Sequence, residues 1–175
     1  MNESTSEIER VFLLDRMPEL DIESELWVIE QGYLLPAQDG FPGVAPEGRI
    51  RRCELPDGTV QYTHTIKKGM GLVREEYERE VTQEAFDLFW PETKGRRIRK
   101  QRTRVPVGDF VWELDCFQGI DLVLAEIELQ DPDTPVDLPD WLQPRILREV
   151  TSDPKYRNFE LACAEFVLSG GKGLT

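Results

Sequence analysis

Residues 123–129 read V-L-A-E-I-E-L, and their strict alternation decides the fold. Successive residues of a β-strand point to opposite faces, so Glu126 and Glu128 lie on one face and Ala125 and Ile127 on the other. The apolar face packs against protein, whereas the two carboxylates need water or ions. One strand of this kind is ordinary on the solvated face of an antiparallel sheet.

The same spacing of two recurs in further pairs of charged residues along the chain. These are Glu7 and Glu9, Arg49 and Arg51, Glu76 and Glu78, Lys100 and Arg102, and Glu113 and Asp115. So many pairs weaken the solvated-face interpretation, because their charged faces together must line something wet. A sheet closed on itself, with charges in its lumen and apolar residues outside, satisfies both faces. We therefore expect a mainly β (α+β) fold, a closed eight-stranded antiparallel β-barrel forming a charged tunnel, with a few flanking helices.

The strand-like segments are separated by turn or loop residues. They cover about residues 5–14, 26–34, 47–54, 59–68, 72–82, 96–105, 108–118 and 121–130. Two short helices are expected over residues 82–90 and 158–168, where apolar residues follow helix-start signals. The stretches 36–48 and 131–144 are rich in Pro together with Gly or Asp, and are expected to be long loops.

Length and charge exclude several classes of protein. The 175 residues fit one domain, expected over 1–168, with a disordered tail at 169–175. The formal net charge of −13 repels polyanions, which argues against a nonspecific nucleic-acid or acidic-membrane binder. The outward charges Arg10, Arg52 and Arg79 argue against a lipid-facing barrel wall. Three separated cysteines and the lack of a long apolar run indicate a reducing, cytoplasmic location.

A series of short motifs resembles the CYTH superfamily, also called triphosphate tunnel metalloenzymes. The motifs are E-I-E-R-V-F-L-L at 7–14, R-I-R-R at 49–52, T-I-K-K-G at 65–69, R-E-E-Y-E-R-E at 74–80, K-Q-R-T-R at 100–104, W-E-L-D-C-F at 112–117, A-E-I-E-L at 125–129 and Y-R-N-F-E-L-A at 156–162. Each motif is weak alone, but their joint order covers nearly the whole chain. The resemblance implies the same tunnel barrel and adds a ligand, which is inorganic triphosphate or an organic triphosphate bound with a divalent cation.

By motif match, the resemblance assigns roles to the charged residues. A triphosphate needs basic side chains to neutralise its charge. The expected phosphate-binding set is Arg49, Arg51, Lys67, Lys100, Arg102 and, as an extra member, Arg157. The expected catalytic residues are Lys100, whose pKa can be lowered by like charges and which would activate the attacking water, and Glu78.

The acids exceed what one metal ion needs, since Mg²⁺ or Mn²⁺ usually takes one or two protein carboxylates. The resemblance implies that the ligands of Mg²⁺ or Mn²⁺ are Glu7, Glu9, Glu126 and Glu128. The supporting tunnel acids are Glu76, Glu113 and Asp115. Together with Glu78, they would orient the basic side chains, hold a second metal or position the attacking water.

One position departs from the family's pattern. The family opens with E-x-E-x-K, and the place of its lysine is taken here by Val11, which shares a face with Glu7 and Glu9. The leading interpretation is metal-dependent hydrolysis of inorganic triphosphate to pyrophosphate and phosphate. The alternatives are an adenylate cyclase, a hydrolase of ATP or thiamine triphosphate, and a non-catalytic polyphosphate or nucleotide binder, which Val11 favours. Outward apolar residues are also consistent with a homodimer.

Overall fold

The computed structural model describes residues 5–35, 47–68 and 73–168, and the side chains of 8–35, 48–67 and 75–164. The side chain of Glu7, most of the expected loop 36–48 and the expected tail 169–175 lie outside this part.

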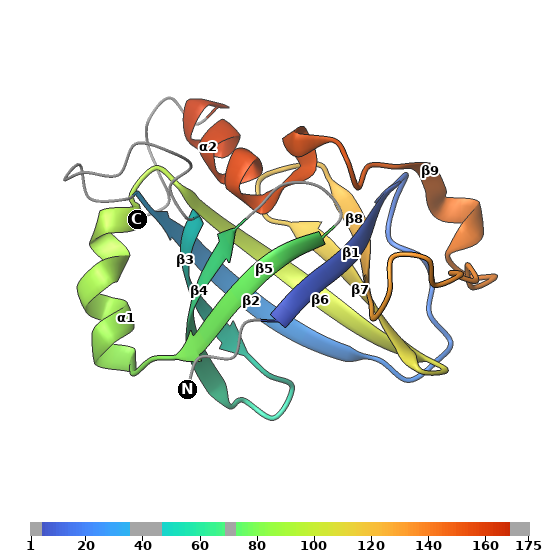
Figure 1. The fold of residues 1–175 in the computed structure, drawn as a ribbon, viewed down its shortest axis with the longest axis horizontal. Coiled ribbons are helices and arrows are strands. Elements are labelled where there is room, and N and C mark those ends of the chain that lie inside the picture. Colours follow the sequence, from blue (N-terminus) through green and yellow to red (C-terminus); the bar gives the residue numbers. More distant parts are fainter. Residues whose placement is uncertain (1–4, 36–46, 69–72, 169–175) are drawn as a thin grey trace.

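Strands dominate the described chain (Figure 1). They are β1 (Thr5–Leu14), β2 (Glu25–Leu34), β3 (Glu47–Glu54), β4 (Val60–Lys68), β5 (Val73–Glu80), β6 (Arg97–Val107), β7 (Phe110–Phe117), β8 (Val123–Leu129) and β9 (Ile146–Glu149). The helices are α1 (Gln83–Phe89), α2 (Asn158–Leu168) and the 3-10 helices η1 (Trp90–Thr93), η2 (Gln143–Arg145) and η3 (Pro154–Tyr156). All the expected strands and both expected helices are present, and β9 was not expected.

The sheet runs in the order β5-β4-β3-β2-β6-β7-β8-β1-β9, and its paired strands are antiparallel. The expected mainly antiparallel fold with few helices is confirmed. The expected closed barrel of eight strands needs a correction, because in the part of the chain that the structure describes the sheet has nine strands and β1 pairs with β5 over only part of its length. The start of β1 returns to β5 over four residue pairs, 5–8 with 73–76, and the end of β1 pairs with β9 instead.

The reason lies in the segment that follows β9. This segment forms hydrogen bonds with the edge of β1 at Val11. The N–H of Val11 donates to Thr151 Oγ1 at 3.0 Å, and the carbonyl of Val11 accepts from the N–H of Val150 at 2.8 Å. A strand edge offers one set of donors and acceptors, so β5 cannot pair with β1 there. The tunnel wall at this point is therefore built by the C-terminal segment.

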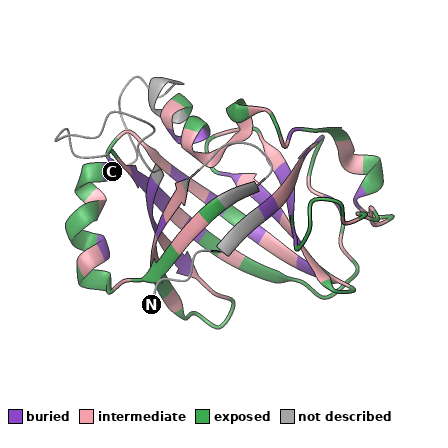
Figure 2. Ribbon diagram, in the orientation of Figure 1, coloured by how far each residue is buried: buried purple, intermediate pink, exposed green. Residues whose placement is uncertain are grey.

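The main hydrophobic core lies on the outer face of the sheet, as the alternation predicts. Its buried members are Ile8, Phe12, Leu14, Val105, Trp112, Leu114, Ala125, Ile127, Leu129 and Leu142. The rings of Phe12 and Trp112 lie 5.8 Å apart. The chain segments after β1 and after β8 cover this face with Met17, Leu20 and Trp141. Buried residues are concentrated on these strands, and β8 has four in succession, Leu124 to Ile127 (Figure 2).

The lumen is not charged throughout. A second apolar cluster occupies one end of it, where α2 lies across the curved sheet (Figure 1). Its buried members are Tyr33, Ile98, Phe117, Leu124, Val150, Leu161 and Ala162. The ring of Tyr33 meets that of Phe159 edge to face, 5.3 Å apart. The charged part of the lumen is therefore closed at one end by helix α2.

One close approach fixes the outer side of β2. A Cβ atom on Gly32 would lie 2.4 Å from Thr93 Oγ1 of η1, far inside van der Waals contact. Thr93 is fully buried, and its hydroxyl donates to the carbonyl of Trp90 at 2.7 Å. Only glycine therefore lets η1 pack this closely on β2.

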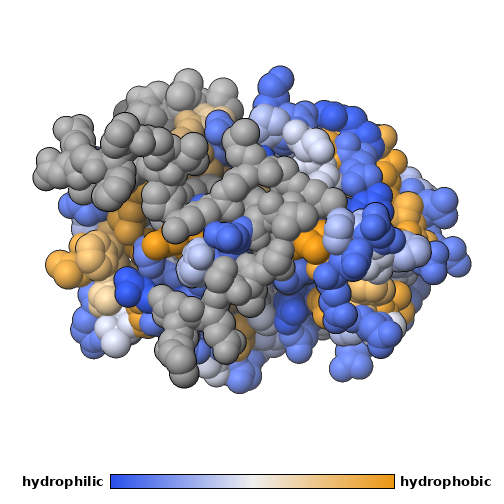
Figure 3. Space-filling model, in the orientation of Figure 1, coloured by the Kyte–Doolittle hydropathy of each residue, from blue (hydrophilic) through white to orange (hydrophobic). Residues whose placement is uncertain are grey.

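The described surface is mainly hydrophilic in the view of Figure 3, with small separate apolar areas. Among the described residues, no helix has the length and apolar character needed to cross a membrane.

Candidate active site

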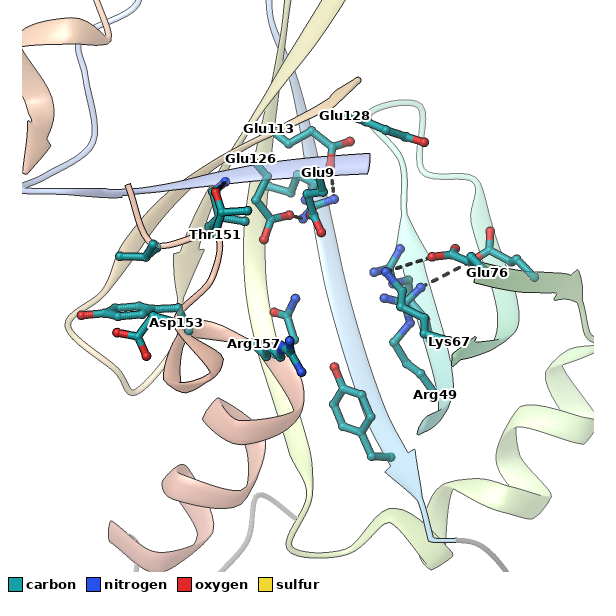
Figure 4. A pocket seen from close by; sticks show the side chains of 18 residues that line it. Glu9, Arg49, Lys67, Glu76, Glu113, Glu126, Glu128, Thr151, Asp153 and Arg157 are labelled. Carbon is teal, nitrogen blue, oxygen red and sulfur yellow. Dashed lines mark hydrogen bonds and ion pairs between the residues drawn. The ribbon is translucent and has the colours of Figure 1, made fainter. Parts of the chain in front are cut away.

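A cavity of about 240 Å³ occupies the charged part of the lumen (Figure 4). Its wall combines most strands of the sheet with the segment between β9 and α2. The charged residues that line it are Glu9, Arg49, Arg51, Lys67, Glu76, Glu78, Arg102, Glu113, Glu126, Glu128, Asp153 and Arg157. In Figure 4, Arg49, Lys67 and Glu76 lie on one side, whereas Glu9, Glu113, Glu126 and Glu128 gather on another.

The basic side is built by β3, β4 and β5. Lys67 Nζ lies 2.9 Å from Glu76 Oε2. Arg49 Nη2 donates to Thr65 Oγ1 at 3.0 Å and lies 3.4 Å from Glu78 Oε2, to which the Thr65 hydroxyl donates at 2.7 Å. The Nε of Arg49 is buried and has no hydrogen-bond partner among the described residues. An unpaired guanidinium donor is costly, so an anion that accepts from it would stabilise this side.

Arg51 has a different environment. Its Nε donates to Gln31 Oε1 at 3.2 Å, and Gln31 Nε2 donates to the hydroxyl of Tyr33 at 2.8 Å. Burial, together with the positive charges of Arg49 and Arg102, lowers the pKa of Arg51 to about 10. Arg51 is still charged at pH 7, but its charge is poorly compensated. A bound anion would supply negative charge that compensates the charge of Arg51.

Arg102 is the centre of the opposite network. Its guanidinium donates to Asp115 from Nε at 2.7 Å and from Nη2 at 2.6 Å, and it also donates to Glu113 and Glu126. Burial opposes the charge of Arg102, but Asp115 and Glu126 outweigh it and hold the pKa of Arg102 well above its ordinary value. Burial likewise opposes the charge of Asp115, yet Arg102 and Lys100 lower the pKa of Asp115 to about 2.

Lys100 lies beneath the cavity instead of on its surface. Its side chain has no exposed area, and its Nζ donates to Asp115 Oδ2 and, at 3.2 Å, to Asn158 Oδ1. Burial, together with the charge of Arg102, lowers the pKa of Lys100 despite the attraction of Asp115. Asn158 lines the cavity and therefore connects this buried lysine to it.

The acidic side has a donor set that fits a hard divalent cation. Glu9 lies directly opposite Glu128 on neighbouring strands, and Glu113 lies directly opposite Glu126. Like charges in such positions repel, so a cation near them would be stabilising. Within the described residues, no three Asp, Glu, His or Cys side chains converge into a preformed metal site. One or two of these carboxylates, with phosphate oxygens and water, would suffice for Mg²⁺.

Comparison with known proteins decides the family. No protein-family model matches the chain. An inorganic triphosphatase of Nitrosomonas europaea is 36% identical over 163 residues, which cover 90% of this chain and 97% of that protein. The chain belongs to the CYTH, or triphosphate tunnel, family. A crystal structure of an inorganic triphosphatase has a TM-score of 0.59 and 33% identity, covering 90% of this chain and 94% of that chain. A protein from Pyrococcus horikoshii, 18% identical with a TM-score of 0.54 over 73% of this chain and 80% of that chain, shares the fold.

Most residues predicted by resemblance to this family line one cavity. They are Glu9, Arg49, Arg51, Lys67, Glu76, Glu78, Arg102, Glu113, Glu126, Glu128 and Arg157. Val11 also lines the cavity, as its register predicts. Lys100 and Asp115 lie below the surface, and Glu7 has its side chain outside the described part. The roles of all these residues in the reaction stay predictions, as do the cytoplasmic location and the homodimer.

Several cavity residues were not predicted from the sequence. They are Tyr33, Val150, Thr151, Asp153, Tyr156 and Asn158. Tyr33 belongs to the inward register of β2, because it lies directly opposite Arg49. That register could have been read from the sequence once β3 was placed beside β2. The segment from Val150 to Asn158 carries no strand alternation, so its position depends on the long-range packing of α2.

Proposed function

We propose that this protein hydrolyses inorganic triphosphate to pyrophosphate and phosphate in the cavity described above. One observation carries the proposal. In the part of the chain that the structure describes, a single small cavity has on one side an arginine with an unpartnered donor and an arginine without a carboxylate partner, and on the other side a group of carboxylates. Among the described residues, the buried Nε of Arg49 has no hydrogen-bond partner, and Arg51 donates to a neutral amide. A dense linear anion is the ligand that best satisfies both. The relationship to triphosphatases supports the same substrate.

Binding of triphosphate is assigned to the basic side chains that line the cavity. Arg49, Arg51 and Lys67 would take the phosphate oxygens, and Arg157 would contact them from the C-terminal segment. The acids Glu76 and Glu78 now pair with Lys67 and Arg49. An incoming phosphate would compete with the carboxylates of Glu76 and Glu78 for these two basic side chains.

The acidic side is assigned to a divalent cation, Mg²⁺ or Mn²⁺. Glu9, Glu126 and Glu128, with Glu7 predicted beside them, would hold it. When bound, the cation supplies neutralisation of the negative charge on the phosphoryl oxygens.

Glu78 is assigned to the attacking water. Its side chain is 42% exposed and lines the cavity next to the buried Arg49, so water can reach it. The water oxygen forms the new bond to phosphorus as the bond to the pyrophosphate oxygen breaks, and the water proton passes to Glu78. Asp115 keeps Arg102 in place beneath the reacting groups.

The test is the release of phosphate, pyrophosphate and cyclic AMP by purified protein from inorganic triphosphate, ATP and thiamine triphosphate. We expect phosphate and pyrophosphate from inorganic triphosphate at the highest kcat/KM. Cyclic AMP from ATP would instead assign a cyclase, and binding without turnover of any substrate would assign a polyphosphate or nucleotide binder.

The cation is tested separately in the same assay. Excess EDTA is expected to abolish hydrolysis, and added Mg²⁺ or Mn²⁺ to restore it. Full turnover in EDTA would overturn the assignment of the acidic side.

A further inference from the structure

Arg51 differs from three other basic residues of the cavity in the kind of group that holds it. Arg49, Lys67 and Arg102 each lie within ion-pair distance of a carboxylate. Arg51, by contrast, forms no ion pair with a carboxylate among the residues that the structure describes, and its hydrogen bond goes to the amide of Gln31. The neutral partner leaves a full positive charge on the cavity wall.

The geometry of Gln31 is fixed on both sides. An arginine has donors only, so the amide oxygen of Gln31 must face Arg51, and its NH₂ group must then face the Tyr33 hydroxyl. Gln31 is fully buried and lies directly opposite Arg51 on the neighbouring strand. Tyr33 in turn packs against Phe159 of α2. The amide is therefore satisfied at both ends and holds the guanidinium in one position.

The chemistry explains why a neutral side chain suits this place. A glutamate there would have the same shape and could keep both hydrogen bonds, because the Tyr33 hydroxyl can donate as well as accept. Its carboxylate would, however, form a charge-assisted pair with Arg51 and cancel the charge that attracts an anion. Glutamine keeps the position and leaves the charge.

We propose that Gln31 is a positioning residue that holds Arg51 through a neutral hydrogen bond, so that the guanidinium keeps its charge for the phosphate groups of the substrate. The inference rests on the proposed function for the identity of the anion. The charge argument applies to any polyanion that enters the cavity.

The test uses Gln31→Glu in the full chain, with Gln101→Glu as the matched control. Gln101 lies on β6, is exposed and does not line the cavity, so its substitution adds the same charge outside the lumen. Binding of inorganic triphosphate, pyrophosphate and sulfate is measured by calorimetry in EDTA, where turnover does not interfere. Gln31→Glu is expected to weaken binding about tenfold to a hundredfold, the range of one contact to a charged group. Gln101→Glu is expected to bind like the wild type.

Two further readouts separate positioning from general damage. Gln31→Glu is expected to melt at or above the wild-type temperature without ligand, because the new carboxylate pairs with Arg51. In the hydrolysis assay its KM is expected to rise more than kcat falls. Gln31→Met, which removes the hydrogen bond without adding charge, is expected to weaken binding less than Gln31→Glu and serves if the glutamate variant does not fold.

The outcomes distinguish this inference from the proposed function. Polyanion binding without hydrolysis by the wild type would overturn the proposed function, while the loss of binding in Gln31→Glu would still support the role of Gln31. Hydrolysis by the wild type, with unchanged binding in Gln31→Glu and Gln31→Met, would overturn the role of Gln31 alone. No binding of any of the three anions by the wild type would overturn both.

Discussion

Replacing Asp115 by asparagine is expected to destabilise the fold strongly, because this carboxylate is the anion between two buried cations. Its side chain has no exposed area, and it accepts hydrogen bonds from both Arg102 and Lys100. Asparagine keeps the shape and removes the charge. Removing one partner of a buried ion pair costs about 3–5 kcal/mol, a large part of the ~5–15 kcal/mol that holds a typical domain folded.

The pH dependence of stability gives a second value for the contribution of Asp115 to the free energy of unfolding. The pKa of Asp115 is lowered in the folded state from its ordinary value of 3.8 to about 2, which corresponds to about 2 kcal/mol. A lowered pKa means that the contribution is fully present above pH 4 and is lost as the pH falls through the folded-state pKa. About half of it is lost by pH 3.

The assay is urea unfolding followed by circular dichroism at several pH values between 7 and 3. The free energy of unfolding of Asp115→Asn is expected to lie about 3–5 kcal/mol below that of the wild type at pH 7, and the gap should narrow by about 1 kcal/mol at pH 3. Asp109→Asn, at an exposed carboxylate on the β6–β7 turn, is the control and should track the wild type. A variant as stable as the wild type, or a gap that does not change with pH, would refute the ion-pair account.

Four further substitutions test the site and the fold. Arg51→Ala is expected to weaken triphosphate binding about tenfold to a hundredfold by calorimetry. Lys100→Ala should lower kcat more than it raises KM, because Lys100 lies beneath the cavity, where it holds Asp115 and Asn158 and does not line the phosphate-binding surface; equal effects of both changes on KM alone would make Lys100 another phosphate-binding residue. Val11→Lys places a cation on the cavity wall opposite Glu126 and is expected to tighten triphosphate binding about tenfold to a hundredfold, while unchanged binding with a lower melting temperature would show that the wall there is dry. Gly32→Ala is expected to cost about 1–3 kcal/mol of unfolding free energy, measured by urea titration, because the new Cβ collides with Thr93; wild-type stability would contradict the close approach of η1 to β2.

The parts of the site that could be predicted are those governed by the period of two along a strand. Glu126, Glu128, Arg49 and Arg51 line the cavity because the members of each pair lie two residues apart on one strand, with buried Ile127 or Ile50 between them pointing to the outer face. That rule gives a side chain's direction, but not its depth. Lys100 obeys the same alternation and lies beneath the surface, held by Asp115 and covered by Asn158 from a distant helix.

The remaining features depend on which segments meet in space. Leu124 belongs to the same inward register as Glu126, yet it belongs to the apolar cluster at the α2 end of the lumen. Nothing in the alternation distinguishes the two ends of a strand. The exchange of partners along β1, from β5 to β9, likewise depends on the chain segment that reaches Val11.

The distribution of the cavity residues over the chain also sets how the site can form during folding. Glu9, Arg49, Arg102 and Arg157 meet in one lumen, although they are widely separated in sequence. Residues so far apart in the sequence can meet only after long loops of the chain have closed, which costs conformational entropy. Folds with many such contacts form slowly. A nascent chain that lacks the last segment has no complete ligand cage. Triphosphate binding is therefore expected to report synthesis of the chain as far as Arg157, since only a fragment that extends from the first strand to this residue contains both.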